Sequence, residues 1–471
     1  MTATLAQVIY GTQVFYLGYF IAINCSYILL GVVSMLTLNR YLDRHALDWQ
    51  PRLHTGAEPP ISILVPACDE EATICGSIRS IMQLEYSEYE VLVINDGSKD
   101  KTLEVLLREF RMLPFSEAYR RQIPCREVRG VYRSTVFSNL RLIDKENGGK
   151  ADALNSGINA ARYPLFCAVD ADSILQRDSL WRIAEPFMED PAMIACGGTV
   201  RIANGCRVED GFLTEIDIPR RPLALFQIVE YLRAFLFGRL GWEPLNALLL
   251  ISGAFGVFRR DRVIEAGGYR GDCMGEDMEL VVRLHRLQRA AGRRYRISFV
   301  PDPICWTEVP ESHSVLKDQR ARWQRGLSES IVYNRGLLFH WRGGAPGWLA
   351  MPFAILFEWL SPLAEVSGYV LMTLGFVFGL ISVEAFMLFF LVALGFGLLL
   401  SVTAMLLEEL SFHLYTRPRN LPTLLIYAVL ENFGYRQLVA VYRLIGLWRW
   451  VTKRKAIWGR MIRSASWHVQ P

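Results

Sequence analysis

Three signals of common soluble protein classes are missing from this sequence of 471 residues. Residues 1–39 contain no Asp, Glu, Lys or Arg, which is typical of a membrane segment rather than of a solvated domain. None of the nine cysteines forms a C-x-x-C pair and no Cys/His grouping has zinc spacing, which favours reduced, mostly buried thiols. The residues around Lys150 do not fit G-x-x-x-x-G-K-[ST], which argues against a P-loop NTPase.

Apolar residues, by contrast, are abundant and make up 52% of the chain. Val8 to Leu38 is almost continuously apolar, and this run exceeds the roughly 20 helical residues that cross a bilayer. A cleaved signal peptide is the alternative interpretation. Its positively charged n-region is missing, however, and the apolar run is too long for it. The sequence therefore predicts an N-terminal transmembrane helix over 1–40.

Two further apolar runs predict a transmembrane hairpin over 350–410. They cover 366–383 and 385–407, with Glu384 as the single charge between them. The remaining stretch, 420–471, is apolar on average up to its basic tail but contains Glu431, Arg436, Arg443 and Arg449. Charges at this density are costly at bilayer depth, so interfacial or re-entrant helices are predicted there instead of a fourth span.

Basic residues near the ends of the three predicted spans indicate their orientation. All of them lie on the cytoplasmic side if the N-terminus is outside; they are Arg40, Arg44, Arg335, Arg342, Arg417 and Arg419. An integral protein of the plasma (inner) membrane with a cytoplasmic domain over 55–310 is therefore expected. The net charge of +4 suits an anionic membrane surface better than nucleic acid.

Short apolar runs alternate with helical stretches between residues 59 and 303. Runs that are apolar throughout predict the buried strands of a mainly parallel α/β sheet. The predicted strands are 61–67, 89–96, 164–172 and the segments MIACGGTVRI, NALLLISGAFGVF and YRISFVP. The predicted helices cover about 72–84, 100–110, 150–162 and 275–290. Ligands of such sheets bind at the carboxyl ends of the strands.

Two of these predicted strands end in residues with carboxylate side chains. Asp96 ends one of them, and Asp170 and Asp172 end another. A helix N-cap would explain any one of these residues, but two strand ends that both close on carboxylates favour a ligand site. At such an end, one carboxylate can contact a ribose or base while its neighbour binds Mg²⁺ or Mn²⁺ shared with substrate phosphates.

Two helix starts add further polar groups. Gly148 and Gly149 precede Lys150 at the start of a predicted helix, a pattern typical of phosphate binding. Asp277, in GEDMEL, opens another predicted helix. It could interact only with the helix dipole, or it could take a proton from an acceptor hydroxyl. The residues alone leave both interpretations open.

The segment QRARW places Trp323 among arginines within a predicted amphipathic segment over 311–345. One interpretation is an interfacial helix with snorkelling arginines and a tryptophan at headgroup level. The other is a role for Arg322 and Trp323 in a ligand site, and the segment alone does not decide between them.

The six motifs VPACDEE, VINDGSKD, NGGKADALNSG, VDADS, GED and QRARW, in this order, resemble those of membrane-bound processive family 2 glycosyltransferases. This group has the GT-A fold and includes cellulose, chitin, hyaluronan and poly-N-acetylglucosamine synthases. The resemblance implies a UDP-sugar donor, Mg²⁺ or Mn²⁺, and one inverting displacement. It also implies roles for particular residues. The donor side comprises Asp96 for the uridine, Lys150 and Asp170 for the nucleotide sugar, and Asp172 for the metal.

On the acceptor side, the resemblance implies that Asp277 is the general base. It also implies that Arg322 neutralises charge on the departing diphosphate and that Trp323 offers a flat face that orients the acceptor sugar. The residues expected at the acceptor are Ser252, Gly253, Gln319 and Trp323. One departure concerns the base of the nucleotide. Relatives commonly have an aromatic residue and Asn where this chain has Cys68 and Asp69, so base recognition must differ if that aromatic residue stacks on the base.

Three functions are compatible with these features. The first is a processive synthase that extends a β-linked polysaccharide and passes it into a membrane channel. Three spans make a thin channel, so a homo-oligomer or a partner subunit is a possible requirement. The second is an enzyme that adds one or a few sugars to a lipid. The third is a non-catalytic channel or scaffold subunit, against which the intact Asp172, Asp277 and Arg322 argue.

Overall fold

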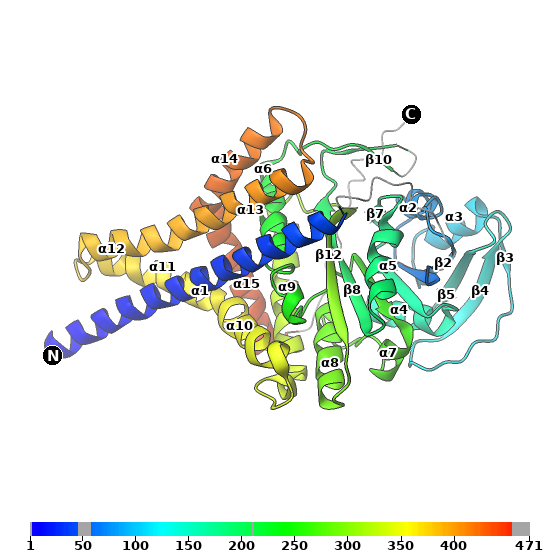
Figure 1. Cartoon of the computed structure of the whole chain (residues 1–471), viewed down its shortest axis with the longest axis horizontal. Coiled ribbons are helices and arrows are strands. Elements are labelled where there is room, and N and C mark those ends of the chain that lie inside the picture. The colour runs from blue at the N-terminus through cyan, green and yellow to red at the C-terminus, as the bar shows by residue number, and fades with distance from the viewer. Residues whose placement is uncertain (1, 46–57, 210–211, 455–471) are drawn as a thin grey trace.

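The computed structural model describes residues 2–45, 58–209 and 212–454. An α/β domain occupies one side of the molecule, and long helices extend from it on the other side (Figure 1). The predicted α/β class is therefore confirmed. The first residues of the predicted domain, 55–57, and most of the predicted basic tail, 455–471, lie outside the described residues.

A ten-stranded sheet forms the centre of the domain. In spatial order its strands are β3 (Met112–Pro114), β4 (Val128–Ser134), β5 (Leu140–Lys145), β2 (Tyr89–Asp96), β1 (Ile61–Ala67), β6 (Leu165–Val169), β11 (Phe255–Arg259), β8 (Met193–Ile202), β12 (Arg296–Thr307) and β7 (Ile174–Leu175). The neighbours β5, β2, β1 and β6 are parallel, and so are β8 and β12. A separate hairpin pairs β9 (Arg207–Glu209) with β10 (Phe212–Glu215).

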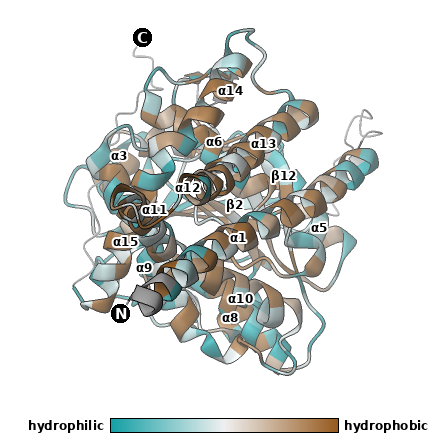
Figure 2. Cartoon of the chain, turned by 90° about the vertical axis from the view of Figure 1, so that its left-hand side faces the viewer, coloured by the Kyte–Doolittle hydropathy of each residue, from teal (hydrophilic) through white to brown (hydrophobic). Residues whose placement is uncertain are grey.

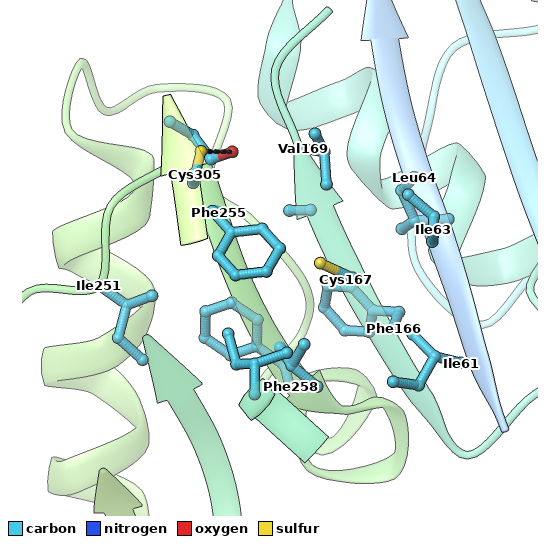
Figure 3. Close-up of a cluster of buried hydrophobic side chains, with 14 of the residues drawn as sticks. Ile61, Ile63, Leu64, Phe166, Cys167, Val169, Ile251, Phe255, Phe258 and Cys305 are labelled. Carbon is cyan, nitrogen blue, oxygen red and sulfur yellow. Dashed lines mark hydrogen bonds between the residues drawn. The ribbon is translucent and has the colours of Figure 1, made fainter. Parts of the chain in front are cut away.

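The sheet is mixed, so the prediction of a mainly parallel sheet was wrong in this respect. Strand β11 lies between β6 and β8 and runs antiparallel to both. Figure 3 shows Phe255 and Phe258 of β11 beside Phe166 of β6 in the core, and the rings of Phe166 and Phe258 stack with centroids 5.5 Å apart. A strand buried on both faces is apolar throughout in either direction. The apolar pattern therefore carried no information about direction.

The predicted strand NALLLISGAFGVF is also shorter than expected, because only Phe255–Arg259 joins the sheet. The residues just before it approach two other parts of the chain. The backbone N–H of Gly253 donates to Asp277 Oδ2 at 3.1 Å, and its carbonyl oxygen accepts from Lys150 Nζ at 3.2 Å. The backbone of Gly253 therefore bonds to the side chains of Asp277 and Lys150 and not to a neighbouring strand.

Four helices of the domain lie close to the predicted positions. They are α2 (Ile74–Ile81), α3 (Thr102–Glu109), α4 (Lys150–Ala160) and α8 (Glu276–Ala290). The helices α5 (Ser179–Glu189) and α7 (Arg260–Glu265) were not predicted. Helix α4 begins at Lys150 because Gly149, with φ of +87°, turns the backbone immediately before it. An L-residue with a side chain rarely adopts this backbone conformation.

The second group of helices contacts the domain and extends away from it. It contains α1 (Thr2–His45), α6 (Pro222–Leu236), α9 (His313–Tyr333), α10 (Met351–Phe353), α11 (Ser361–Val377), α12 (Val383–Phe390), α13 (Phe396–Phe412), α14 (Asn420–Leu430) and α15 (Arg436–Val451). Figure 2 views the projecting end and shows mostly apolar residues on α11 and α12 and many on α1.

Two helices are long and apolar enough to cross a membrane. They cover Gln7–Arg44 and Val383–Phe412. A third span is possible if Pro346–Trp359 and Ser361–Val377, which meet at a 40° bend, form one span. Three spans were expected from the sequence, and the structure reaches that number only if the bent pair is one span. Among the described residues, the stretch 421–451 contains no candidate span.

The charged residues of that stretch point toward the rest of the protein. Glu431 pairs with Arg233 of α6, and Arg436 donates to Asn432. Arg443 Nε donates to Gln324 Oε1 at 2.9 Å, and Arg449 pairs with Asp318 at 3.2 Å. Both of the last two partners belong to α9. Helix α15 therefore contacts α9 through polar side chains, which explains why charges occur in an apolar sequence.

Helix α9, which contains QRARW, is held between two other helices at very short range. A Cβ atom built on Gly446 of α15 would lie 2.4 Å from the carbonyl oxygen of Ala321. On the other side of α9, a Cβ atom on Gly326 would lie 2.7 Å from the backbone nitrogen of Gly275, which precedes α8. These distances are too short for any side chain, so both glycines are required for the packing.

We expect Gly446→Val to lower both thermal stability and catalytic rate. Overpacking of this kind costs about 1–3 kcal/mol, and relief would require α9 to move away from α15. The matched control is Gly18→Val in α1, where an added Cβ meets nothing within 4 Å. The melting temperature and the transfer rate of both purified variants test this expectation. Equal behaviour of the two variants would contradict it.

Candidate active site

One cavity of about 1400 Å³ contacts every residue that the sequence placed in the site. These residues are Asp96, Lys150, Asp170, Asp172, Ser252, Gly253, Asp277, Gln319, Arg322 and Trp323. The cavity begins at the carboxyl ends of β1, β2 and β6 and continues along α6 and α9 to residues of α1, α11, α13 and α15. Its wall therefore combines the catalytic domain with the helices that extend from it.

Asp96 holds the glycine turn that precedes α4. Its carboxylate accepts hydrogen bonds from the backbone N–H groups of Gly148 at 2.9 Å and Gly149 at 2.7 Å, and from Lys145 Nζ at 2.6 Å. A carboxylate has about four lone-pair positions, so one position is left for a ligand. At the same end of the cavity, Cys68 lines the wall and is exposed.

Lys150 and Asp170 form an ion pair at the carboxyl ends of the parallel strands. Lys150 is the first residue of α4, and Asp170 directly follows β6. Burial alone would lower the pKa of Lys150. The nearby carboxylates of Asp170, Glu276 and Asp277 outweigh it and raise that pKa. Lys150 is therefore charged at neutral pH and can bind an anionic group such as a phosphate.

Two carboxylates stand side by side at the start of α8. Asp277 Oδ2 accepts from Gly253 N and its Oδ1 accepts from Met278 N at 2.8 Å. Glu276 is buried, and burial raises its pKa to about 7, with Asp277 adding to the increase and Lys150 opposing it. Asp277 is the more accessible of the two. It is thus better placed to meet an acceptor, whereas Glu276 belongs to the wall around Lys150.

Asp172 lies at the end of β6 and is buried, with 7% of its surface exposed. Among the described residues, no three His, Cys, Asp or Glu side chains form a group that could hold a metal ion by themselves. Mg²⁺ and Mn²⁺ do not require such a group when a substrate diphosphate supplies oxygen ligands, because one or two carboxylates then suffice. Asp172 and Asp170, both on the cavity wall, fit that requirement.

Trp323 projects from α9 into the cavity, with 44% of its surface exposed. The guanidinium of Arg320 lies 4.2 Å from the centroid of the indole ring. Arg320 is itself buried, and its Nη2 donates to Glu230 Oε2 at 2.7 Å. The Tyr435 hydroxyl donates to the same Glu230 oxygen at 2.6 Å. The ring is therefore supported on one side and open to the cavity on the other.

Several of these supporting residues were not identified from the sequence. Arg320 belongs to the QRARW motif, and its position three residues before Trp323 places both on one helix face. Glu230 is the single acidic residue of the largely apolar helix α6, and this feature could have been noticed in the sequence. Its partner Tyr435 lies 205 residues further along the chain, so the pairing itself left no signal in the sequence.

Comparison with known families identifies the chain. Residues 62–120 match the family described as "Glycosyl transferase family 2", and residues 123–326 match "Glycosyltransferase like family 2". The matched segments adjoin and contain the strand-end carboxylates, the start of α8 and QRARW. The chain belongs to glycosyltransferase family 2. The resemblance inferred from the six motifs is thereby confirmed.

Curated relatives of this family 2 glycosyltransferase include two staphylococcal proteins. The poly-beta-1,6-N-acetyl-D-glucosamine synthase of Staphylococcus aureus strain COL is 29% identical over 292 residues, which is 61% of this chain and 60% of the relative. The protein of the same name from Staphylococcus epidermidis is 28% identical over 273 residues, which is 58% of this chain and 55% of the relative. The matches thus span less than two thirds of each relative.

A solved structure shows the same fold. The mannosyltransferase PcManGT from Pyrobaculum calidifontis, in complex with GDP-Man and Mn²⁺, aligns with 93% of this chain and 100% of its own chain. The TM-score is 0.54 and the sequence identity is 16%. At this identity the similarity concerns the fold alone. The predicted GT-A architecture is confirmed.

Proposed function

We propose that this glycosyltransferase is an inverting, metal-dependent enzyme that uses a UDP-sugar to extend a β-linked polysaccharide and feeds the product toward the membrane helices. One observation supports this proposal above all. The same cavity contacts the donor-side carboxylates, the base candidate Asp277 and residues of α1, α11, α13 and α15. A growing glycan that leaves the site along this cavity would reach the membrane without crossing solvent.

The proposed reaction is a single displacement at the anomeric carbon. Asp277 accepts the proton of the acceptor hydroxyl while that oxygen attacks the carbon from the face opposite to the diphosphate. The bond between the carbon and the diphosphate oxygen breaks, and UDP leaves. Arg322 and Lys150 neutralise the charge that grows on the diphosphate. Ser252, Gly253, Gln319 and Trp323 hold the acceptor sugar, which keeps its hydroxyl aligned for attack.

Mg²⁺ or Mn²⁺ would supply a further positive charge to the diphosphate when it is bound. Asp172, assisted by Asp170, would hold it, in line with the fit described above. The other contribution on the donor side comes from residues of the chain. Asp96 keeps the glycine turn and α4 in place, so that Lys150 reaches the donor.

N-acetylglucosamine is the first sugar to test, because the two staphylococcal relatives are named for its polymer. Purified protein in nanodiscs is incubated with a panel of labelled UDP-sugars and Mg²⁺ or Mn²⁺. We expect a labelled product with UDP-N-acetylglucosamine. Absence of transfer from every UDP-sugar would overturn the proposed activity, and transfer of a different sugar would overturn only the choice of donor.

A second candidate is an enzyme that adds one or a few sugars to a lipid acceptor. It is favoured by the small number of candidate spans in the described residues, which is two or at most three. So few helices enclose a channel poorly unless a second copy or a partner subunit contributes. A denaturing gel separates the alternatives, since a processive enzyme makes long products directly and a lipid glycosyltransferase makes short ones.

We further propose that the catalytic domain faces the cytoplasm. Arg417, after α13, pairs with Glu215 and Asp217 of the catalytic domain, whereas Glu384 is exposed at the opposite end of the hairpin. An impermeant thiol reagent added to intact cells should therefore label Glu384→Cys and should not label Thr416→Cys. Wild-type cells give the background from native cysteines. The reverse labelling pattern would place the domain away from cytosolic nucleotide sugars and contradict the proposal.

Trp323 should matter for transfer and not for donor hydrolysis. We expect Trp323→Ala to reduce transfer to a sugar acceptor several-fold, up to about tenfold, because an aromatic stacking contact contributes roughly 0.5–1.5 kcal/mol. Hydrolysis of the UDP-sugar by water should stay near wild type, since water needs no platform. Trp323→Phe keeps a flat face and should recover part of the transfer. Equal loss of both reactions would argue that Trp323 only stabilises α9.

A further inference from the structure

In the described structure, the segment that brings Ser252 and Gly253 into the active site is neither a helix nor a strand. It covers residues 247–253 and precedes β11. Most of these residues line the cavity. Without the repeating hydrogen bonds of a helix or a sheet, the backbone of such a segment is held by contacts with side chains from other parts of the chain. The residues that supply those contacts therefore decide where Ser252 and Gly253 lie.

One such contact comes from His285, a fully buried residue of α8. Its Nε2 atom lies 2.8 Å from the carbonyl oxygen of Leu248, and its Nδ1 atom lies 2.7 Å from the hydroxyl of Tyr295. Burial lowers the pKa of His285 to about 4, which keeps the ring neutral at neutral pH. A neutral ring carries one proton, and a carbonyl oxygen can only accept. Nε2 therefore carries the proton and donates to Leu248, and Nδ1 is an acceptor.

The hydroxyl of Tyr295 connects His285 to a second residue of the same helix. It donates to Nδ1 of His285 and accepts from Nε of Arg289 at 3.1 Å. Arg289 also belongs to α8, and Tyr295 directly precedes β12. The hydrogen bonds thus run in one direction, from Arg289 to the carbonyl oxygen of Leu248. A buried polar network in which each group satisfies the next one adds rigidity to its surroundings.

The other end of the segment is attached to α8 as well. The backbone N–H of Gly253 donates to Asp277 Oδ2 at 3.1 Å, and Asp277 lies in the first turn of α8. Asp277 and His285 are about two turns apart on one helix. Two contacts with one helix therefore hold the segment, one near each end, relative to the base candidate.

Packing alone does not explain a histidine at this position. Its neighbours Val281, Val282 and Leu284 are apolar and fully buried, so a leucine would suit the same surroundings without needing polar partners. Burying a polar side chain is costly unless its hydrogen bonds are made. The histidine contributes what a leucine lacks, namely a donor directed at the carbonyl oxygen of Leu248.

We propose that His285 is a positioning residue for sugar transfer, which holds Ser252 and Gly253 beside Asp277 through its hydrogen bond to the carbonyl oxygen of Leu248. This role rests on the proposed function, in which Ser252 and Gly253 hold the acceptor sugar. His285 acts through the segment and does not touch the substrate. Tyr295 and Arg289 fix the direction in which the ring donates.

Two amide variants of different length test this role. The side-chain nitrogen of glutamine is as many bonds from Cβ as Nε2 of histidine, so His285→Gln can still donate to Leu248. Asparagine ends at the distance of Nδ1, so His285→Asn cannot reach Leu248. We expect His285→Asn to lower transfer about tenfold or more, because small displacements of groups that orient a substrate are costly in rate. His285→Gln should stay within about threefold of wild type, since it keeps the hydrogen bond.

A second measurement separates positioning from a loss of structure. Purified variants in nanodiscs receive labelled UDP-N-acetylglucosamine, with short N-acetylglucosamine oligomers as acceptor or with water alone. Hydrolysis by water and the Kd for UDP should keep their wild-type values in both variants, because neither requires the acceptor segment. The ratio of transfer to hydrolysis should therefore fall in His285→Asn and recover in His285→Gln. The matched control is His313→Asn, at an exposed position at the start of α9, which should behave as wild type.

Wild-type transfer by His285→Asn would overturn the proposal. Equal losses in His285→Asn and His285→Gln would also overturn it, and so would a fall in hydrolysis that matches the fall in transfer. If His285→Asn does not yield monodisperse protein, Tyr295→Phe decides in its place. That variant lacks only the hydroxyl that orients the ring, so it should lower transfer and leave hydrolysis unchanged, and wild-type transfer would contradict the proposal. Failure of the proposed function would be recognised separately, as the absence of transfer by the wild type.

Discussion

Asp277→Asn is expected to abolish sugar transfer while the protein still binds UDP with nearly wild-type affinity. The amide keeps the size of the carboxylate, and its oxygen can still accept from Gly253 N, so the local structure should survive. It cannot accept the acceptor proton. General-base catalysis typically contributes about 10²–10⁴-fold, and we expect a loss in that range. Single-turnover transfer and UDP binding, measured on the same preparation, test the two halves of this prediction.

Glu276→Gln is the informative control for Asp277. Burial raises the pKa of Glu276 to about 7, which makes its neutral form more accessible than that of an ordinary glutamate. Its charge-neutral variant should therefore retain much of the transfer activity. If Glu276→Gln abolishes transfer and Asp277→Asn does not, the base is Glu276. Loss of UDP binding in Asp277→Asn would instead indicate a structural or donor-binding role for Asp277.

Asp172→Asn should remove most of the turnover with any divalent cation. A neutral amide is a poor ligand for a hard cation shared with a diphosphate. Because that cation supplies several kcal/mol of charge stabilisation, the rate should fall about a hundredfold or more. Asp261→Asn, at an exposed position of α7, is the control and should match wild type. Turnover near wild type in Asp172→Asn, or wild-type activity in excess EDTA, would remove Asp172 from the metal site.

The strand-end carboxylates were predictable because their positions depend on local sequence. Continuous apolar runs form β1, β2 and β6, and parallel neighbours must end at the same edge of the sheet. Asp96 and Asp170 therefore had to lie close together. Gly149 similarly determines where α4 begins, and hence where Lys150 stands. The roles of these residues in binding remain predictions that the experiments above test.

Features that depend on distant contacts could not be predicted. The direction of β11 could not be predicted from its sequence, since a buried strand is equally apolar in either direction. The packing of α9 against α15 depends on Gly446, 125 positions beyond Ala321 in the numbering of the chain, and on van der Waals contact between backbones. The predicted segment over 311–345 contains α9, and only the structure shows that α9 has α8 on one side and α15 on the other.

By itself, the sequence determined the α/β class, the apolar helices, the motifs and the family. These properties follow from hydrophobic periodicity, charge and short-range turn chemistry, which are properties of neighbouring residues. Only the tertiary structure decided which residues surround Trp323. Arg320, Glu230 and Tyr435 come from three different helical segments and meet beside it. The physical reason is that buried charges are placed by partners and cavities that assemble only when distant segments pack together.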